Sequence, residues 1–188
     1  MKKASLICFL GLVLSLLLGA AFKAELLESS VRYTGTANGG GNPWQGVAPV
    51  DSLELSFDDG RLRQTLELKI TVKADQFDGG NWLLNRNGQI LVFESGKYPD
   101  IVFEATGVDL ENLSDGESRA VLDGVLKLHG VEKTIEVEVG LEHQSNRLSA
   151  KGQFTILLSD YNMKRPSGFG FTIDDLIVID FDISTELN

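Results

Sequence analysis

The sequence of 188 residues has one cysteine, Cys8, and two histidines, His129 and His143. Cys8 lies inside an N-terminal apolar run, too early to be the cysteine at the cleavage site of a lipoprotein signal. Without that segment the chain has no thiol, which excludes disulfides, a thiol nucleophile, an iron–sulfur centre and a cysteine-based zinc site. The sequence contains neither a Gly-x-Ser-x-Gly nor a His-Glu-x-x-His motif. We therefore expect no catalytic residue and no metal site, and we expect that the protein is not an enzyme.

Basic residues are also scarce, because 17 Lys and Arg stand against 27 Asp and Glu, for a net charge of −10. Nucleic acids and anionic membrane surfaces both attract Lys/Arg patches. The acidic balance therefore argues against a nucleic-acid partner. Charges of both signs are spread along the chain, which is typical of a solvated surface.

Long apolar stretches are absent except at the N-terminus. Lys2 and Lys3 precede an apolar run from Leu6 to Leu18, and small residues follow at Gly19–Ala21. This order is typical of a secretory signal peptide. A membrane-spanning helix is the alternative, but the run is short for a hydrocarbon core of about 30 Å. We predict a signal peptide over residues 1–21, export, and a single domain over residues 22–188 that is not an integral membrane protein.

The remaining sequence alternates between apolar and polar residues. A period of two places one face of a β-strand in an apolar interior and the other in water. Turn signals at Asp58–Gly60, Asp115–Gly116 and Gln144–Asn146 separate such runs. The sequence thus predicts an all-β fold, either an antiparallel barrel or a two-sheet sandwich. The alternating runs are Leu53–Phe57, Leu66–Val72, Ile101–Ala105, Ile135–Leu141, Leu148–Ile156 and Ile177–Ile183.

One stretch, Asp75–Ser95, has no clean period of two. Asn81, Asn85 and Asn87 in it are typical of caps and turns. We expect a loop with a short helix that closes one end of a barrel.

Three motifs occur in order along the chain: KYPDIVF at Lys97–Phe103, GVLKLHGVEK at Gly124–Lys133, and FTILLSDY at Phe154–Tyr161 with KRPS at Lys164–Ser167. Together they resemble the signature segments of the YceI-like family, and the resemblance covers roughly residues 31–184. The family usually carries a histidine before the tyrosine–proline motif. This chain instead reads NRNGQI at Asn85–Ile90, so a role tied to that histidine is not carried over.

The resemblance implies a lipocalin-like, eight-stranded antiparallel barrel, a periplasmic location, and an elongated apolar cavity that holds a polyisoprenoid chain in some members. The alternation alone allows either a packed core or a cavity, because a barrel of this size has room for side chains or one slim ligand. We expect Trp44 and Trp82 at a rim. The candidate ligand-binding residues are Trp44, Leu68, Ile70, Trp82, Phe93, Phe103, Leu126, Leu128, Val137, Phe154, Ile179 and Phe181.

Two functions remain open at this stage. The first is an exported carrier or sequestering protein for an isoprenoid-type lipid, with no cofactor besides that lipid. The second is a non-catalytic structural or stress-related interaction module with a filled barrel, which would act through outer loops at residues 35–50 and 164–171. The sequence leaves open whether the barrel forms a homodimer. We interpret His129 as a turn residue, Asp174 and Asp175 as a turn, and Asp180 and Asp182 as the outer face of a strand.

Overall fold

The structure is a computed structural model that describes residues 21–23, 25–41, 43–57, 65–109, 116–168 and 171–186. The predicted signal segment before Ala21 and the turns predicted at Asp58–Gly60 and at Asp115 lie outside these residues. The strands are β1 (Ala21–Lys23), β2 (Glu25–Leu26), β3 (Ser30–Ala37), β4 (Trp44–Pro49), β5 (Ser52–Phe57), β6 (Thr65–Lys73), β7 (Asp100–Asp109), β8 (Gly116–Leu128), β9 (Val131–Gln144), β10 (Arg147–Leu157), β11 (Ser167–Gly168) and β12 (Phe171–Glu186).

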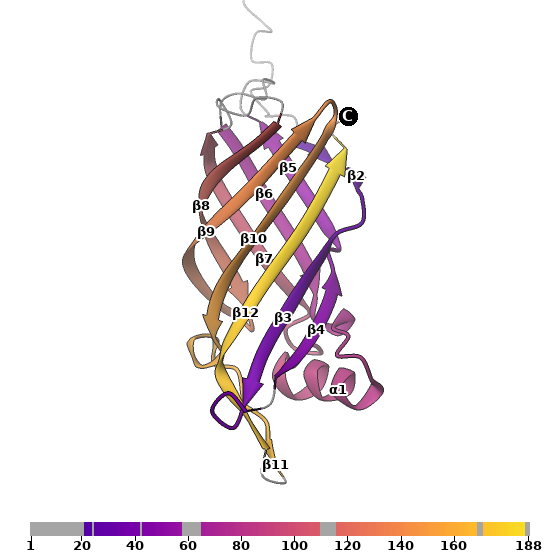
Figure 1. Cartoon of the computed structure of the whole chain (residues 1–188), viewed down its shortest axis with the longest axis vertical. Helices are drawn as coiled ribbons and strands as arrows, with labels where there is room; N and C mark the ends of the chain where they lie inside the picture. Colours follow the sequence, from indigo (N-terminus) through magenta and orange to yellow (C-terminus); the bar gives the residue numbers. More distant parts are fainter. Residues whose placement is uncertain are drawn as a thin grey trace, which may run out of the picture.

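The alternating runs all form strands, so the prediction of an all-β fold is confirmed. Long tilted strands make up the wall of the molecule (Figure 1). In β9 the residues from Val137 to Leu141 alternate between buried and exposed, as the period of two requires. The turn predicted near Ser145 and Asn146 joins β9 to β10. Neighbouring strands pair antiparallel in the order β1-β5-β6-β7-β8-β9-β10-β12-β3-β4.

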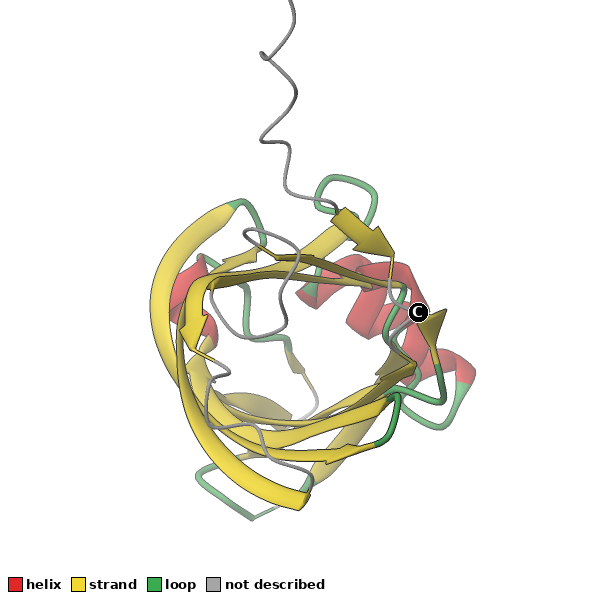
Figure 2. Ribbon diagram, turned by 90° about the horizontal axis from the view of Figure 1, so that it is seen from above, coloured by secondary structure: helices red, strands yellow, loops and turns green. Residues whose placement is uncertain are grey.

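The sheet closes on itself where the chain passes from β4 to β5. β4 pairs with β3, and β5, after the short link at Val50 and Asp51, pairs with β6. The amide of Val50 donates to the carbonyl of Ser29 next to β3, whereas the amide of Asp51 donates to Thr71 in β6. The chain therefore changes neighbours at this bend, and the strands form a ring (Figure 2).

With β4 and β5 taken as two halves of one bent strand, the described ring has eight strands: β3, β4–β5, β6, β7, β8, β9, β10 and β12. This matches the predicted lipocalin-like barrel. The outer face is charged and carries cross-strand ion pairs, such as Lys127 with Glu104 at 2.9 Å and Lys151 with Asp182 at 2.9 Å. Such exposed pairs add little stability, so the apolar inner face dominates the energetics of the wall.

The segment Asp75–Ser95, which has no period of two, lies at one end of the barrel and is not part of the strand wall (Figure 1). It contains a 3₁₀ turn η2 (Ala74–Gln76), the helix α1 (Trp82–Asn87) and a π-helical turn η3 (Gly88–Val92). Asn81 caps α1 by accepting a hydrogen bond from the Leu84 amide at 3.0 Å, and the Asn85 side chain accepts one from the Gly79 amide. The predicted short helix and the cap at Asn81 are confirmed, whereas Asn85 and Asn87 lie within α1 and Asn87 makes no side-chain cap bond. Among the described helices, none combines the length and apolar character needed to cross a bilayer.

Two sequence interpretations are wrong. The segment 35–50 is mostly strand, since β3 runs to Ala37 and β4 begins at Trp44; its turn lies at residues 38–41. Asp174 and Asp175 lie within β12, where the pairing with β3 shifts register between Ile173 and Ile177. A bulge interrupts the alternation there, and two adjacent aspartates resemble a turn for that reason.

The inner face can be tested on β12, where Phe181 points inward and Leu176 lies on the exposed face. We expect Phe181→Ala to lower the free energy of unfolding by about 3 kcal/mol, from lost transfer energy and the added void. Leu176→Ala on the same strand should change it by less than about 0.5 kcal/mol. Urea unfolding of lipid-free protein measures both. Equal effects of the two variants would mean that the register of β12 is wrong.

Candidate functional site

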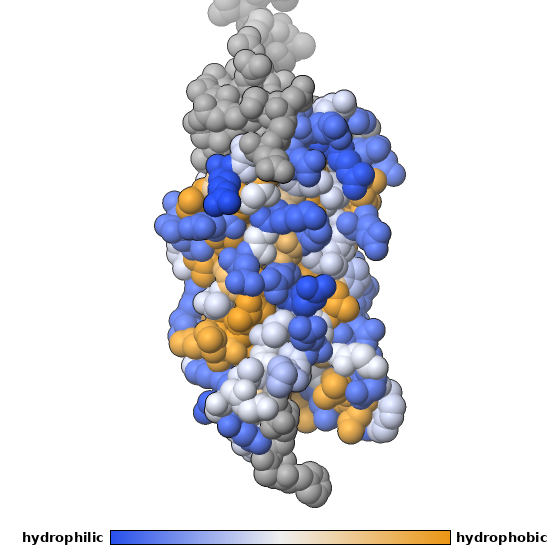
Figure 3. Space-filling model, viewed as in Figure 1, coloured by the Kyte–Doolittle hydropathy of each residue, from blue (hydrophilic) through white to orange (hydrophobic). Residues whose placement is uncertain are grey.

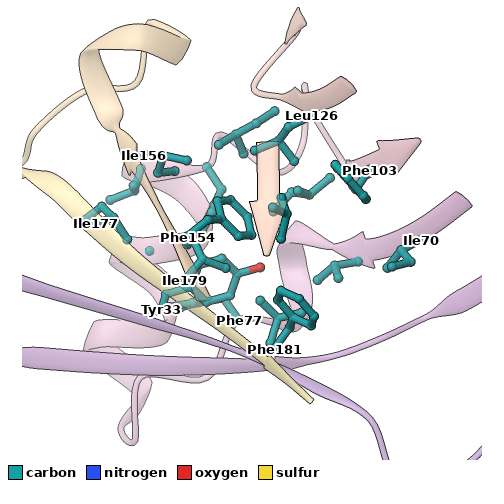
Figure 4. A pocket seen from close by; sticks show the side chains of 18 of the residues that line it. Tyr33, Ile70, Phe77, Phe103, Leu126, Phe154, Ile156, Ile177, Ile179 and Phe181 are labelled. Carbon is teal, nitrogen blue, oxygen red and sulfur yellow. The ribbon is translucent and has the colours of Figure 1, made fainter. Parts of the chain in front are cut away.

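The ring encloses an elongated cavity of about 480 Å³. Every strand of the ring contributes side chains to its wall, and α1 and η3 contribute at one end. Figure 4 shows labelled side chains such as Phe154, Ile70 and Leu126 converging on the central space from different strands. Its volume lies in the range of small-molecule pockets, about 300–1,000 Å³. No charged side chain of the described residues lines it.

All predicted ligand-binding residues except Trp82 line this cavity: Trp44, Leu68, Ile70, Phe93, Phe103, Leu126, Leu128, Val137, Phe154, Ile179 and Phe181. Whether they contact a ligand stays a prediction. Trp82 lies on the outer side of α1 with 72% of its surface exposed, and it does not line the cavity. Its placement depends on how α1 docks, which no local sequence pattern encodes.

Several residues that line the cavity were not predicted from the sequence. One of them is Tyr33, which carries a hydroxyl group. Val31, Tyr33, Gly35 and Ala37 are buried and alternate with more exposed residues along β3. This alternation was present in the sequence and could have identified the inward face of β3. The other lining residues that were missed include Leu84, Leu91, Leu122, Val139, Leu148, Ile173, Ile177 and Ile183.

Glycines in the wall explain why the interior is not filled by its aromatic residues. A Cβ added at Gly152 would lie 2.4 Å from the ring of Phe181, and one added at Gly124 would lie 2.4 Å from the ring of Phe103. The tips of these rings therefore occupy the space beside neighbouring glycines, against the wall. The axis of the barrel stays open as a result.

The end that carries α1 is the mouth of the cavity. Leu84 and Leu91 line the cavity and yet are 43% and 47% exposed. Trp82, Leu83 and Ile90 beside them are also exposed. Figure 3 shows apolar side chains gathered over the position of α1 at the lower right of the molecule. The apolar wall of the cavity thus continues onto the outer surface at this end.

A cluster of aromatic rings fixes the α1 end to the barrel. Phe77 meets Phe93 at 5.4 Å between ring centroids and Tyr33 at 6.1 Å. The Phe77 ring fits against Gly46 and Gly88, where added Cβ atoms would lie 2.0 and 2.6 Å from it. The close fit positions η3 over the end of the barrel.

Carboxylates hold the loops around the mouth. Asp174 accepts hydrogen bonds from the Thr36 hydroxyl at 2.6 Å and from the amides of Gly39 and Gly40, which keep the pKa of Asp174 below its usual value. Asp175 accepts from the hydroxyl and amide of Ser159, and its pKa is lowered in the same way. Both groups therefore stay ionised and fasten the adjoining turns to β12.

His129 sits in the β8–β9 turn, and its contacts support the interpretation as a turn residue. Its ring is buried beside Tyr98, with 4.2 Å between ring centroids, and Nδ1 donates to the Tyr161 carbonyl at 3.1 Å. Nε2 lies 3.5 Å from a carboxylate oxygen of Glu94, which also pairs with Lys164 at 2.7 Å. The hydrogen bond from Lys164 lowers the pKa of Glu94. No cluster of metal-ligating side chains occurs within the described ranges.

Comparison with known proteins supports a family and a fold. A family model of the YceI-like domain matches residues 23–185. No curated protein matches the chain. A solved polyisoprenoid binding domain from Saccharophagus degradans, implicated in plant cell wall breakdown, superposes with a TM-score of 0.71 at 17% identity, covering 88% of this chain and 99% of that one.

Two further structures share the fold. BcnA of Burkholderia cenocepacia gives a TM-score of 0.64 at 20% identity over 83% of this chain and 95% of its own. A YceI protein of Campylobacter jejuni gives 0.55 at 16% identity over the full length of both chains. At these identities the likeness shows the fold alone.

Proposed function

The chain belongs to the YceI-like family, and from this premise we propose that it binds a long apolar lipid of the polyisoprenoid type inside its barrel. In this role it acts as an exported carrier or sequestering protein and not as an enzyme. The cavity is the single observation that carries the proposal. It is long and apolar, it opens at the end that carries α1, and its lining has no charged group among the described residues.

The size of the cavity favours a ligand over a packed core. A packed core leaves few voids larger than a water molecule, whereas the interior of this barrel surrounds an apolar space of about 480 Å³. A lipid chain in this space is stabilised by burial, since each buried CH₂ contributes about 0.8 kcal/mol. The filled-barrel alternative does not account for such a space.

The shape of the cavity and the family suggest the type of lipid. An elongated cavity bounded by flat rings suits a slim chain, and the solved domain from Saccharophagus degradans is described as polyisoprenoid binding. The charged outer face would keep such a complex dispersed in water. The apolar surface at Leu84 and Leu91 is where the chain would enter.

The first test combines extraction with a blocking variant. Mass spectrometry of an organic extract of purified protein should find a prenyl lipid near one per chain. Leu126→Trp places an indole in the lumen, because Leu126 is buried and lines the cavity. We expect this variant to keep the thermal midpoint of delipidated protein but to lose the lipid.

Val121→Trp is the matched control, since Val121 lies on the same strand and is exposed. It should retain the lipid. Wild-type protein that carries no lipid and takes none up after delipidation would refute the carrier function. A large loss of stability in Leu126→Trp would indicate a filled interior instead, because overpacking costs about 1–3 kcal/mol.

The mouth is tested by two neighbouring residues of η3. Leu91 lines the cavity, whereas Ile90 is similarly exposed but does not line it. Leu91→Asp should slow the uptake of a detergent-dispersed prenyl lipid, because an ionised group at the opening must be desolvated as the chain passes. Ile90→Asp should leave the uptake rate within about twofold, which is less than 0.5 kcal/mol. Equal rates for both variants and wild type would place the entry elsewhere.

Export is tested at the N-terminus. The signal-peptide order of Lys2, Lys3, the apolar run and the small residues through Ala21 predicts cleavage after Ala21. N-terminal sequencing of protein recovered from the periplasm should begin at Phe22. Intact Met1 in a membrane fraction would overturn the proposed location.

A further inference from the structure

Tyr33 places a hydroxyl group in the middle of the apolar cavity. Its partners across the sheet are Ile179 in β12 and Gly46 in β4. Ile179 lies midway between Ile173 at the mouth and Thr185 at the far end, both of which line the cavity. The Tyr33 side chain is only 7% exposed, and its oxygen points into the space between the labelled residues in Figure 4.

The ring of Tyr33 is held in one orientation by two other aromatic residues. It packs edge-on against Phe77 at 6.1 Å and against Phe93 at 5.8 Å, with interplanar angles of 61° and 69°. Such T-shaped contacts are favourable and directional. The direction of the hydroxyl is therefore set by the packing and not by a hydrogen bond.

The hydroxyl, which faces the cavity, makes no hydrogen bond to another described residue, and burial alone shifts its pKa. The hydroxyl of Thr185, in contrast, donates to the carbonyl of Glu25 at 2.9 Å. Burial raises the pKa of Tyr33, so the group keeps its proton and remains a donor. A buried hydroxyl without a partner is unfavourable, and phenylalanine would fill the same space without that penalty. Of the other polar side chains of the described wall, Gln45, Asn87 and Ser167 lie at the mouth, and Thr185 lies at the far end.

We propose that Tyr33 donates a hydrogen bond to a neutral oxygen atom of the bound lipid. The apolar wall continues on both sides of Tyr33, with Ile177 and Ile173 toward the mouth and Phe181 and Ile183 toward the far end. The oxygen must therefore be flanked by apolar groups, as in a ketone, an ester or an ether. A charged head group at this depth is excluded, because no described cation lines the cavity to offset its desolvation.

This inference rests on the proposed function, and the experiment separates the two. Delipidated protein is titrated with a long-chain alkane and with the ketone of the same length whose carbonyl lies at the centre of the chain, each by displacement of a fluorescent apolar probe. For each protein, the affinity for the ketone is divided by the affinity for the alkane. The ratio for wild type is then divided by the ratio for Tyr33→Phe. We expect a value of about 2 to 12, which corresponds to a net hydrogen bond of about 0.5–1.5 kcal/mol.

Tyr33→Phe should keep the thermal midpoint, since the change removes one oxygen, and the alkane serves as the reference ligand within each variant. Tyr161→Phe is the control, because Tyr161 is buried but does not line the cavity. It should keep the wild-type ratio. If the ratio in Tyr33→Phe equals that of wild type while the alkane binds, the inference about Tyr33 fails and the lipid-binding function stands. If neither probe binds wild type, both fail.

Discussion

The closing bend between β4 and β5 is the constraint on which the interior depends. Val50 still bonds to Ser29 beside β3 and Asp51 already bonds to β6, so the bent strand formed by β4 and β5 has β3 as its neighbour along one half and β6 along the other. The remaining edge of β5 is covered by β1, and this arrangement limits the open edges of the sheet. It also holds the wall in place without side chains that meet at the axis. The apolar inner face can therefore surround a space, which an open sheet could do only by packing against a second layer.

Much of the fold could be predicted because its determinants are local. Alternation along Ile177–Ile183 or Leu148–Ile156 identifies a half-buried strand from a few residues. The apolar positions of each run are then the ones that face the interior. Eleven of the candidate residues line the cavity for this reason. The presence of an open space could not be derived in the same way. It depends on Phe103 and Phe181 lying over glycines of neighbouring strands, and the alternation of one strand does not show which residues oppose it.

The misplaced residues lie where the period of two fails. Trp82 belongs to a six-residue helix, too short for its apolar positions to show which side packs on the barrel. Asp174 and Asp175 lie at a register shift, where four steps along β12, from Ile173 to Ile177, match two steps along β3 and interrupt the alternation. Tyr33 is different. The alternation along β3 indicates that it points inward, but its hydroxyl group is not typical of a residue that lines an apolar cavity. An inward tyrosine is ordinary when its hydroxyl finds a partner, and only the structure shows that this one does not.

The wall glycines also govern which ligands the cavity can admit. At Gly152 an added Cβ would lie 2.4 Å from the Phe181 ring and 2.5 Å from the Glu138 carbonyl, so the ring could yield only by turning toward the axis. At Gly124 an added Cβ would lie 2.4 Å from the Phe103 ring and 2.7 Å from the Glu104 carbonyl, so the Phe103 ring is restricted in the same way. Gly124 and Gly152, which do not line the cavity, thus set how far the rings of Phe103 and Phe181 reach into it. Tyr33 presents a hydroxyl at one depth, and Leu84 and Leu91 lie at the opening. The wall glycines, Tyr33 and the two leucines lie on different elements of the structure. A substitution at one of them can therefore change the width of the cavity, its preference for an oxygen atom or its opening without unfolding the barrel.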